Sequence, residues 1–189
     1  MSQNLSWNHH IDRTSKKGNS TLGFLRRNLR INNEAVKNTA YTSLVRPGLE
    51  YCSTVWNPYT KDLSYKLEML QKRAARYVTN RYHNTSSVSS MIDHLGWETL
   101  ESRRTKAQLI MIYKMANELV DIPASQYLIQ APRRPKDHNK KYHQPSTSTS
   151  YYKNSFFPRT ITVWNRLPAT AAEAPDLVSF KQGLSSLTF

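Results

Sequence analysis

The chain has 189 residues, which is long enough for one compact domain with a tail. It carries 27 Lys and Arg against 13 Asp and Glu, and a formal net charge of +14 favours a polyanionic partner, because neutralising phosphates releases counterions. Its only cysteine is Cys52, which excludes an internal disulfide and a cysteine-built zinc site, so we expect no disulfide-linked partner, metal or other cofactor.

Apolar residues recur at helical spacing through the first two-thirds of the chain. The first helix, assigned to residues 1–30, has Ser6 as a potential N-cap and carries Ile11 on its apolar face. Gly18 and Gly23 should weaken the middle of this helix. Basic side chains near its end project away from the apolar residues: Arg26, Arg27 and Arg30.

A second helix is expected after a cap at Asn32 or Asn33. Pro47 should end or sharply bend it, because proline lacks the amide that the helix needs. The third helix has the clearest pattern, with Thr60 placed to cap it and an apolar stripe of Leu63, Leu67, Leu70, Ala74 and Tyr77. Basic residues surround this stripe and follow it: Lys72, Arg73, Arg76 and Arg81.

Two further helices are predicted before the composition changes. Ser87 begins a fourth helix that Gly96 stops, and Thr99 begins a fifth with Pro123 beyond its end. The fifth helix has a broad apolar face: Leu100, Ala107, Ile110, Met111, Met115 and Leu119. None of these helices is stable alone in water, so we predict a mostly α fold with a helical bundle over residues 31–129.

Residues 130–153 are rich in Pro, Ser, Thr and basic side chains, and we predict a flexible basic linker or mobile arm there. Its cations include Arg133, Arg134, Lys140 and Lys141. Residues 154–189 are expected to form a small, irregular aromatic segment, in which Ile161 to Val163 fits either a short strand or a helical turn. The chain should end in an amphipathic helix with Leu177, Phe180, Leu184 and Leu187.

Five short segments stand in a fixed order along the chain: LGFLRRNL at 22–29, LVRPGLEY at 44–51, QKRAAR at 71–76, LGWETL at 95–100 and SFFPRTI at 155–161. Together they resemble the region downstream of the catalytic palm in reverse transcriptases of non-LTR, jockey-like retrotransposons. The resemblance runs from about Leu5 to Phe180 and implies a thumb and C-terminal region, with residues 1–30 at the handover from palm to thumb. We expect a fragment of such an element that lacks the fingers and palm.

The chain lacks the pattern of a polymerase active site. Such a site needs carboxylates close together to hold two metal ions, and reverse transcriptases supply part of the set as an aromatic-x-Asp-Asp signature. Here no two acidic residues are adjacent, and there is no His-Glu-x-x-His motif. We therefore expect no catalytic residue, no metal site and no enzymatic activity, although the parent family is RNA-directed DNA polymerases. Cys52 is expected to be buried and inert.

The resemblance implies that the basic residues grip a template–primer duplex through phosphates, without base specificity and with a steep salt dependence. The partners would be RNA or an RNA–DNA duplex and a palm-containing polymerase. Arg103 and Arg104 are further candidates, although Glu101 is placed to pair with one of them. Three alternatives remain open: a merely soluble basic protein, a helical protein-interaction module, and a transposon remnant with no biochemical role.

Two patterns bear on location. The first ten residues have no apolar stretch of the kind found in a secretory signal, and no run approaches the ~20 apolar residues that span a bilayer. We therefore expect an intracellular protein without membrane contact, and the sequence leaves nucleus and cytoplasm equally open.

Overall fold

The computed structural model describes residues 6–83, 85–132 and 138–189. These residues are mostly helical and contain no β-strand, only an isolated bridge between Gln130 and Tyr142. The predicted fold class is therefore confirmed. The chain divides into two compact units, residues 1–103 and 104–189, so the division falls within one helix and not at the expected linker.

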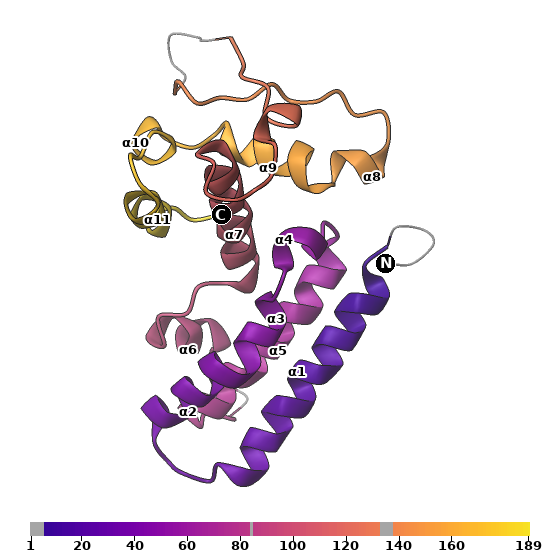
Figure 1. Ribbon diagram of the computed structural model, residues 1–189. Coiled ribbons are helices and arrows are strands. Elements are labelled where there is room, and N and C mark those ends of the chain that lie inside the picture. The colour runs from indigo at the N-terminus through magenta and orange to yellow at the C-terminus, as the bar shows by residue number, and fades with distance from the viewer. Residues whose placement is uncertain (1–5, 84, 133–137) are drawn as a thin grey trace. The chain divides into compact units, whose positions relative to one another are not determined.

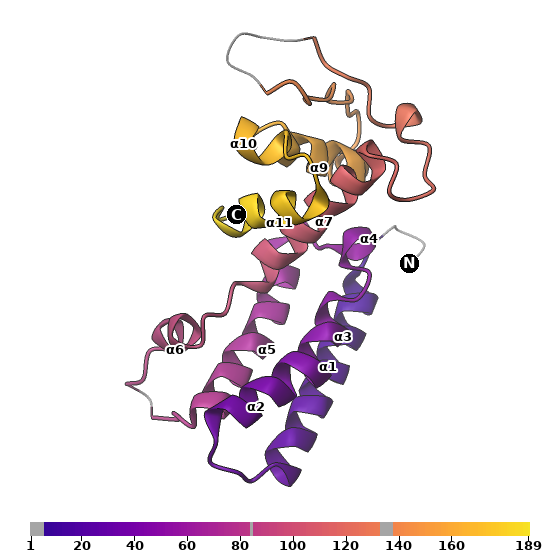
Figure 2. The ribbon, with the colours of Figure 1, turned by 60° about the vertical axis from the view of Figure 1, so that its left-hand side comes forward.

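The first unit is built on three parallel or antiparallel helical rods that lie side by side in Figures 1 and 2. One rod is α1, the middle one is the continuous series α2, a π-helical turn and α3, and the third is α5. The elements in chain order are α1 (Asn8–Asn28), α2 (Glu34–Ala40), the π-turn (Tyr41–Val45), α3 (Arg46–Glu50), α4 (Ser53–Trp56), α5 (Lys61–Thr79), α6 (Val88–His94) and the start of α7 (Leu100–Ala116).

The glycines do not interrupt α1, which runs unbroken over 21 residues. Gly18 is buried, and a Cβ at this position would lie 2.6 Å from Cδ1 of Leu70 and 2.9 Å from Cδ2 of Leu49. Both distances are shorter than real carbon contacts, so the absence of a side chain lets Leu70 of α5 and Leu49 of α3 pack against the backbone of α1. The expected weak point of the helix is thus a contact point of the three rods.

Pro47 does not end the second rod as predicted. The chain passes from α2 through the π-turn into α3, and Pro47 occupies the first turn of α3. A proline fits a first turn because its missing amide needs no helical partner there, and the wider π-turn just before it accommodates the ring. The rod ends instead at Tyr51, where Cys52 adopts the left-handed conformation with φ of 51°.

Cys52 is exposed, so the expectation of a buried, inert cysteine is wrong. The turn at Cys52 places Trp56 in the core, and the cysteine remains outside it. The indole Nε1 of Trp56 donates a 2.7 Å hydrogen bond to the carbonyl of Tyr51, which fixes the ring across the end of the bundle.

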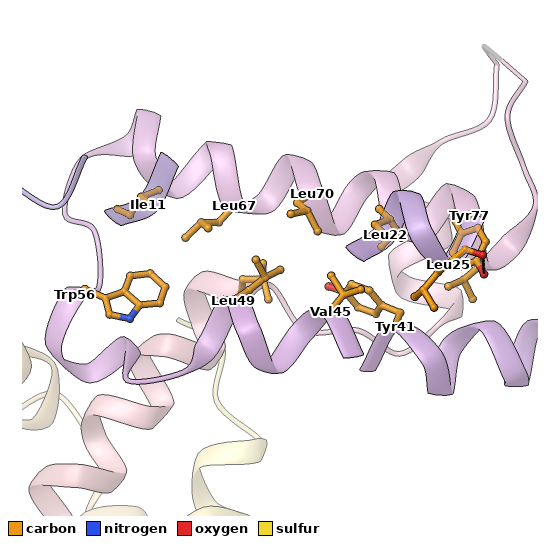
Figure 3. Packing of buried hydrophobic residues seen from close by; sticks show 13 residues of the cluster. Ile11, Leu22, Leu25, Tyr41, Val45, Leu49, Trp56, Leu67, Leu70 and Tyr77 are labelled. Carbon is orange, nitrogen blue, oxygen red and sulfur yellow. Dashed lines mark hydrogen bonds between the residues drawn. The ribbon is translucent and has the colours of Figure 1, made fainter. Parts of the chain in front are cut away.

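The core of the first unit follows the stripe predicted for the third helix. Leu67, Leu70 and Tyr77 on α5 are buried, and Figure 3 shows them facing the side chains of the middle rod, with α1 completing the cluster. The labelled residues of the other two rods are Ile11, Leu22 and Leu25 on α1 and Tyr41, Val45 and Leu49 on the middle rod.

Three of the five predicted side-chain caps are present. Thr60 occupies the N-cap position of α5 without a side-chain hydrogen bond to the helix, and the N-cap position of α1 is Trp7 and not Ser6. Asn33 accepts a 3.1 Å hydrogen bond from the amide of Val36 at the start of α2, and Ser87 caps α6 in the same way. Gly96 ends α6 with φ of 62°, the left-handed conformation expected of a residue just past a helix end. Thr99 caps α7 by accepting from the amide of Ser102.

The second unit contains most of α7, a 3₁₀ turn (Ala124–Gln126), α8 (Ser150–Lys153), α9 (Phe156–Trp164), α10 (Ala169–Ala172) and α11 (Leu177–Ser185). The segment that fitted a strand or a helical turn is helical, in α9. The final amphipathic helix is confirmed, with Phe180 and Leu184 buried. The buried apolar residues of α7 are Leu100, Leu109, Ile112, Tyr113 and Met115. Of the face predicted for this helix, Ala107, Ile110 and Met111 are only half-buried, and Leu119 lies beyond the helix and is exposed.

Residues 138–144 are not a free linker, because they bind the end of α9. His138 is buried, with Nε2 3.3 Å from the carbonyl of Trp164, and the Trp164 indole donates to the carbonyl of Lys140 at 2.7 Å. Asn165 exchanges two hydrogen bonds with the backbone of Tyr142. Hydrogen bonds from the end of α9 thus order residues 138–144, although the composition of this segment predicts a flexible linker.

Over the described residues, no helix combines the length and the apolar character needed to cross a bilayer.

We predict that Gly18→Ala lowers the free energy of unfolding by about 1 kcal/mol or more, because a buried methyl must displace the Leu49 and Leu70 side chains. The measurement is urea unfolding followed by tryptophan fluorescence, since three of the four tryptophans, Trp7, Trp56 and Trp97, belong to the first unit.

Gly48→Ala is the matched control, because nothing lies within 4 Å of a Cβ at that helical position. It should leave stability unchanged or raise it by about 0.5–1 kcal/mol. Equal effects of the two substitutions would contradict the close approach at Gly18.

Candidate nucleic-acid interface

Helices α1 and α5 run in the same direction and keep one register. The ammonium of Lys66 lies 2.8 Å from Asp12, and Nη1 of Arg73 donates to Oδ1 of Asn19 at 2.9 Å. Both pairs are separated by 54 residues in sequence, and the second pair lies seven residues beyond the first on each helix. A seven-residue repeat keeps two parallel helices in contact over successive turns. The C-terminal halves of α1 and α5 therefore lie next to each other.

Both of these halves are free of carboxylates. No Asp or Glu occurs between Arg13 and Asn33, or between Met69 and Ile92. The shared register brings the two acid-free stretches together, so their cations reinforce one another and have no counter-charge within these stretches. We call these residues the α1–α5 basic surface: Arg26, Arg27 and Arg30 from the end of α1, and Lys72, Arg73, Arg76 and Arg81 from α5 and the turn after it.

Most of this surface is open to solvent. Arg26, Arg27, Arg30, Arg73 and Arg81 are exposed, while Lys72 and Arg76 are half-buried. Exposed guanidinium groups keep their fork of donors available to a phosphate.

Two exposed tyrosines hold cations of the basic surface in place. The guanidinium carbon of Arg26 lies 5.7 Å from the ring centre of Tyr82, and the ammonium of Lys72 lies 5.6 Å from that of Tyr65. Contact with a ring face attracts a cation without neutralising its charge. The Arg26–Tyr82 contact also joins the end of α1 to the turn that follows α5.

The carboxylates of the first unit are concentrated elsewhere, around the junction of α6 and α7. Four of them hydrogen-bond to groups within residues 94–103: Glu34, Glu50, Glu68 and Glu98. Asp12 and Asp62 instead lie in the N-terminal parts of α1 and α5. Asp12 pairs with Lys66, whose ammonium holds the pKa of Asp12 below its usual value. Opposite charges are therefore segregated, and the α1–α5 basic surface keeps its positive field.

Arg103 and Arg104 do not belong to this surface. Arg103 donates two hydrogen bonds to the carboxylate of Glu50, which raises the pKa of Arg103, and Glu101 is not its partner as the sequence suggested. Arg104 is fully buried. Both are wrong as nucleic-acid candidates, because one is committed to an ion pair and the other cannot be reached from solvent. Spacing signals this, since Arg104 lies four residues from the buried Leu100 and Gln108.

The remaining candidates belong to the second unit. Lys140 and Lys141 are half-buried, and the ammonium of Lys140 lies 5.8 Å from the ring centre of Tyr113. Arg133 and Arg134 lie outside the described residues.

Sequence reasoning missed one basic residue that the structure places at the end of the surface. Lys37 is 6% exposed, and its ammonium lies 5.1 Å from the ring centre of Tyr77. The signal was present in the spacing, because Lys37 stands four residues before Tyr41 and eight before Val45, both of which are buried. A lysine in line with buried residues on the same helix face is unusual, because lysine side chains are rarely buried.

An apolar hollow of about 580 Å³ lies between α1 and the rod formed by α2 and the π-turn. Phe24, Val36 and Leu44 line it and are 56%, 40% and 59% exposed. All three are apolar side chains on helices, and the structure leaves them uncovered within their unit.

Within the residues that the structure describes, no group of three or more His, Cys, Asp or Glu side chains is arranged to hold a metal ion. No protein-family model, no curated protein and no solved structure matches the chain. The resemblance to retrotransposon reverse transcriptases thus rests on the five sequence segments alone.

We predict that Arg103→Met lowers the free energy of unfolding by about 1–3 kcal/mol, because it leaves the Glu50 carboxylate without its partner in a half-buried site. Arg73→Met is the matched control, since this exposed guanidinium donates to a neutral amide, and it should change stability by about 0.5 kcal/mol or less. Urea unfolding measures both. An Arg103→Met variant as stable as the control would show that the ion pair does not hold the unit together.

Proposed function

We propose that the chain is a non-catalytic protein that holds the backbone of RNA or of an RNA–DNA duplex without sequence specificity. In this proposal it corresponds to the thumb and C-terminal region downstream of the palm in a non-LTR retrotransposon reverse transcriptase. The supporting observation is the α1–α5 basic surface, which combines exposed arginines with two adjacent helical segments that carry no carboxylate.

The size of the surface suits a nucleic-acid strand. From Lys72 to the end of α5 at Thr79 the surface covers about 10 Å at a rise of about 1.5 Å per residue, and Arg81 extends it in the turn that follows. One strand of a duplex presents a phosphate about every 3.4 Å along its axis, so the surface meets on the order of four phosphates. Lys and Arg side chains bind phosphate oxygens irrespective of the base, which accounts for binding without sequence preference.

We predict that the triple variant Lys72→Glu, Arg73→Glu, Arg76→Glu weakens binding of an RNA–DNA duplex at least tenfold at low salt, because it places three carboxylates where phosphates would bind. Fluorescence anisotropy with a labelled duplex of arbitrary sequence measures the affinity.

The control is a triple variant of equal net charge in the second unit, Lys153→Glu, Arg166→Glu, Lys181→Glu, all at exposed positions. It should weaken binding much less. An equal loss in both variants would mean that only net charge matters, and unchanged affinity in the first would refute the proposed surface.

The second candidate function is a helical protein-interaction module, and the exposed apolar hollow lined by Phe24, Val36 and Leu44 favours it. A groove of this kind accepts the apolar face of a partner helix. The resemblance names a palm-containing polymerase as the partner. Under this candidate Phe24→Ser with Leu44→Ser abolishes association with the palm, and the charge-reversal triple leaves it intact.

The third possibility is a transposon remnant without a biochemical role, which two observations outside the protein can test. Reading the DNA next to the coding region in frame for an aromatic-x-Asp-Asp stretch tests the proposed origin. Detection of the folded product in cells separates a working protein from a remnant.

A further inference from the structure

A pocket of about 350 Å³ opens at one end of the first unit, where the end of α1, the loop to α2 and the end of α5 converge. Its volume lies at the lower end of the range for small-molecule sites. The charged and aromatic residues that line it are Arg26, Arg30, Lys37, Tyr77 and Tyr82, and two asparagines complete its polar lining. Three are cations, and none of the residues lining it is acidic.

Lys37 is the central feature of this pocket. More than nine-tenths of the residue is buried, yet its ammonium has neither a carboxylate nor a hydrogen-bond acceptor among the residues that the structure describes. The Tyr77 ring attracts the ammonium without neutralising its charge. The Lys37 nitrogen is not one of the fully buried side-chain atoms that lack a hydrogen-bond partner, so it reaches the pocket, where an anion from solvent can pair with it.

The two arginines are placed to share such an anion. Nε of Arg30 donates to the carbonyl of Arg27 at 3.2 Å, which orients the side chain and leaves its terminal nitrogens as donors. The Arg26 guanidinium lies over the Tyr82 ring at the pocket wall. Planar guanidinium forks match the oxygens of a phosphate.

We propose that this pocket binds a phosphomonoester dianion of a nucleotide, either free or at the end of a nucleic-acid strand. Lys37, Arg30 and Arg26 would hold the phosphate oxygens, and the Tyr82 ring would lie beside the attached nucleoside. Three cations without a carboxylate favour a dianion over the single charge of an internal phosphodiester. The inference rests on the proposed function for the identity of the partner as a nucleic acid, and it adds a specific site to a surface that is otherwise indifferent to sequence.

The first test titrates the full chain with inorganic phosphate at constant ionic strength, against chloride, and follows the tyrosine ring resonances by NMR. Saturable shifts confined to Tyr77 and Tyr82 are expected. Equal responses to phosphate and chloride would overturn the site. A mononucleotide that binds more tightly than inorganic phosphate identifies a nucleotide as the ligand, and equal affinities identify the phosphate group alone; either supports the shared chemistry.

The second test compares single strands that end in a hydroxyl, a 5′-phosphate or a 3′-phosphate. One phosphorylated end should bind at least fivefold more tightly than the hydroxyl end. Lys37→Met should abolish that preference, so that the phosphorylated and hydroxyl-ended strands bind the variant equally tightly. Lys61→Met, at an exposed position at the start of α5, is the matched control and should keep the preference.

If Lys37→Met does not fold, Arg30→Met at an exposed position serves as the second variant and should reduce the preference at least threefold. No preference for a phosphorylated end, with intact duplex binding, would overturn the pocket and leave the proposed function standing. Saturable phosphate binding by a chain that does not bind duplexes would support the pocket and overturn the proposed function.

Discussion

The close approach of α1, α3 and α5 at Gly18 is the constraint on which the first unit depends. A hydrogen in place of a side chain allows Leu70 and Leu49 to reach the backbone of α1. With the rods this close, polar contacts seven residues apart, Asp12 with Lys66 and Asn19 with Arg73, keep α1 and α5 in one register. Close helix packing of this kind needs small residues at the contact.

That register has an electrostatic consequence. It aligns two stretches that lack carboxylates, while Glu34, Glu50 and Glu68 of the same unit bond to groups around the start of α7. The unit thus separates its charges by structure, although the chain as a whole mixes them. A positive surface of this type attracts a polyanion over a distance that salt shortens.

Features fixed by local chemistry could be predicted from the sequence. The caps at Asn33, Ser87 and Thr99 and the left-handed Gly96 depend on a few neighbouring residues, and the stripe on α5 depends only on helical period. The mostly α fold follows from these elements.

Features that depend on distant contacts could not be predicted. Pro47 continues a helix because a π-turn precedes it, Cys52 is exposed because the chain turns sharply there, and residues 138–144 are ordered by the end of α9. The same holds for the candidate site. Charge counting identified the arginines of α1 and α5, but only the structure shows that Arg103 is committed to Glu50, that Arg104 is buried and that Lys37 is a buried cation.

The central claim is that phosphates replace the missing counter-charges of the α1–α5 basic surface. Its most direct test is the dependence of duplex affinity on salt concentration, because each phosphate neutralised by the protein releases bound counterions. For about four phosphates, the logarithm of the association constant should fall with the logarithm of salt concentration with a slope of about −3 to −4. A slope near zero would contradict the account.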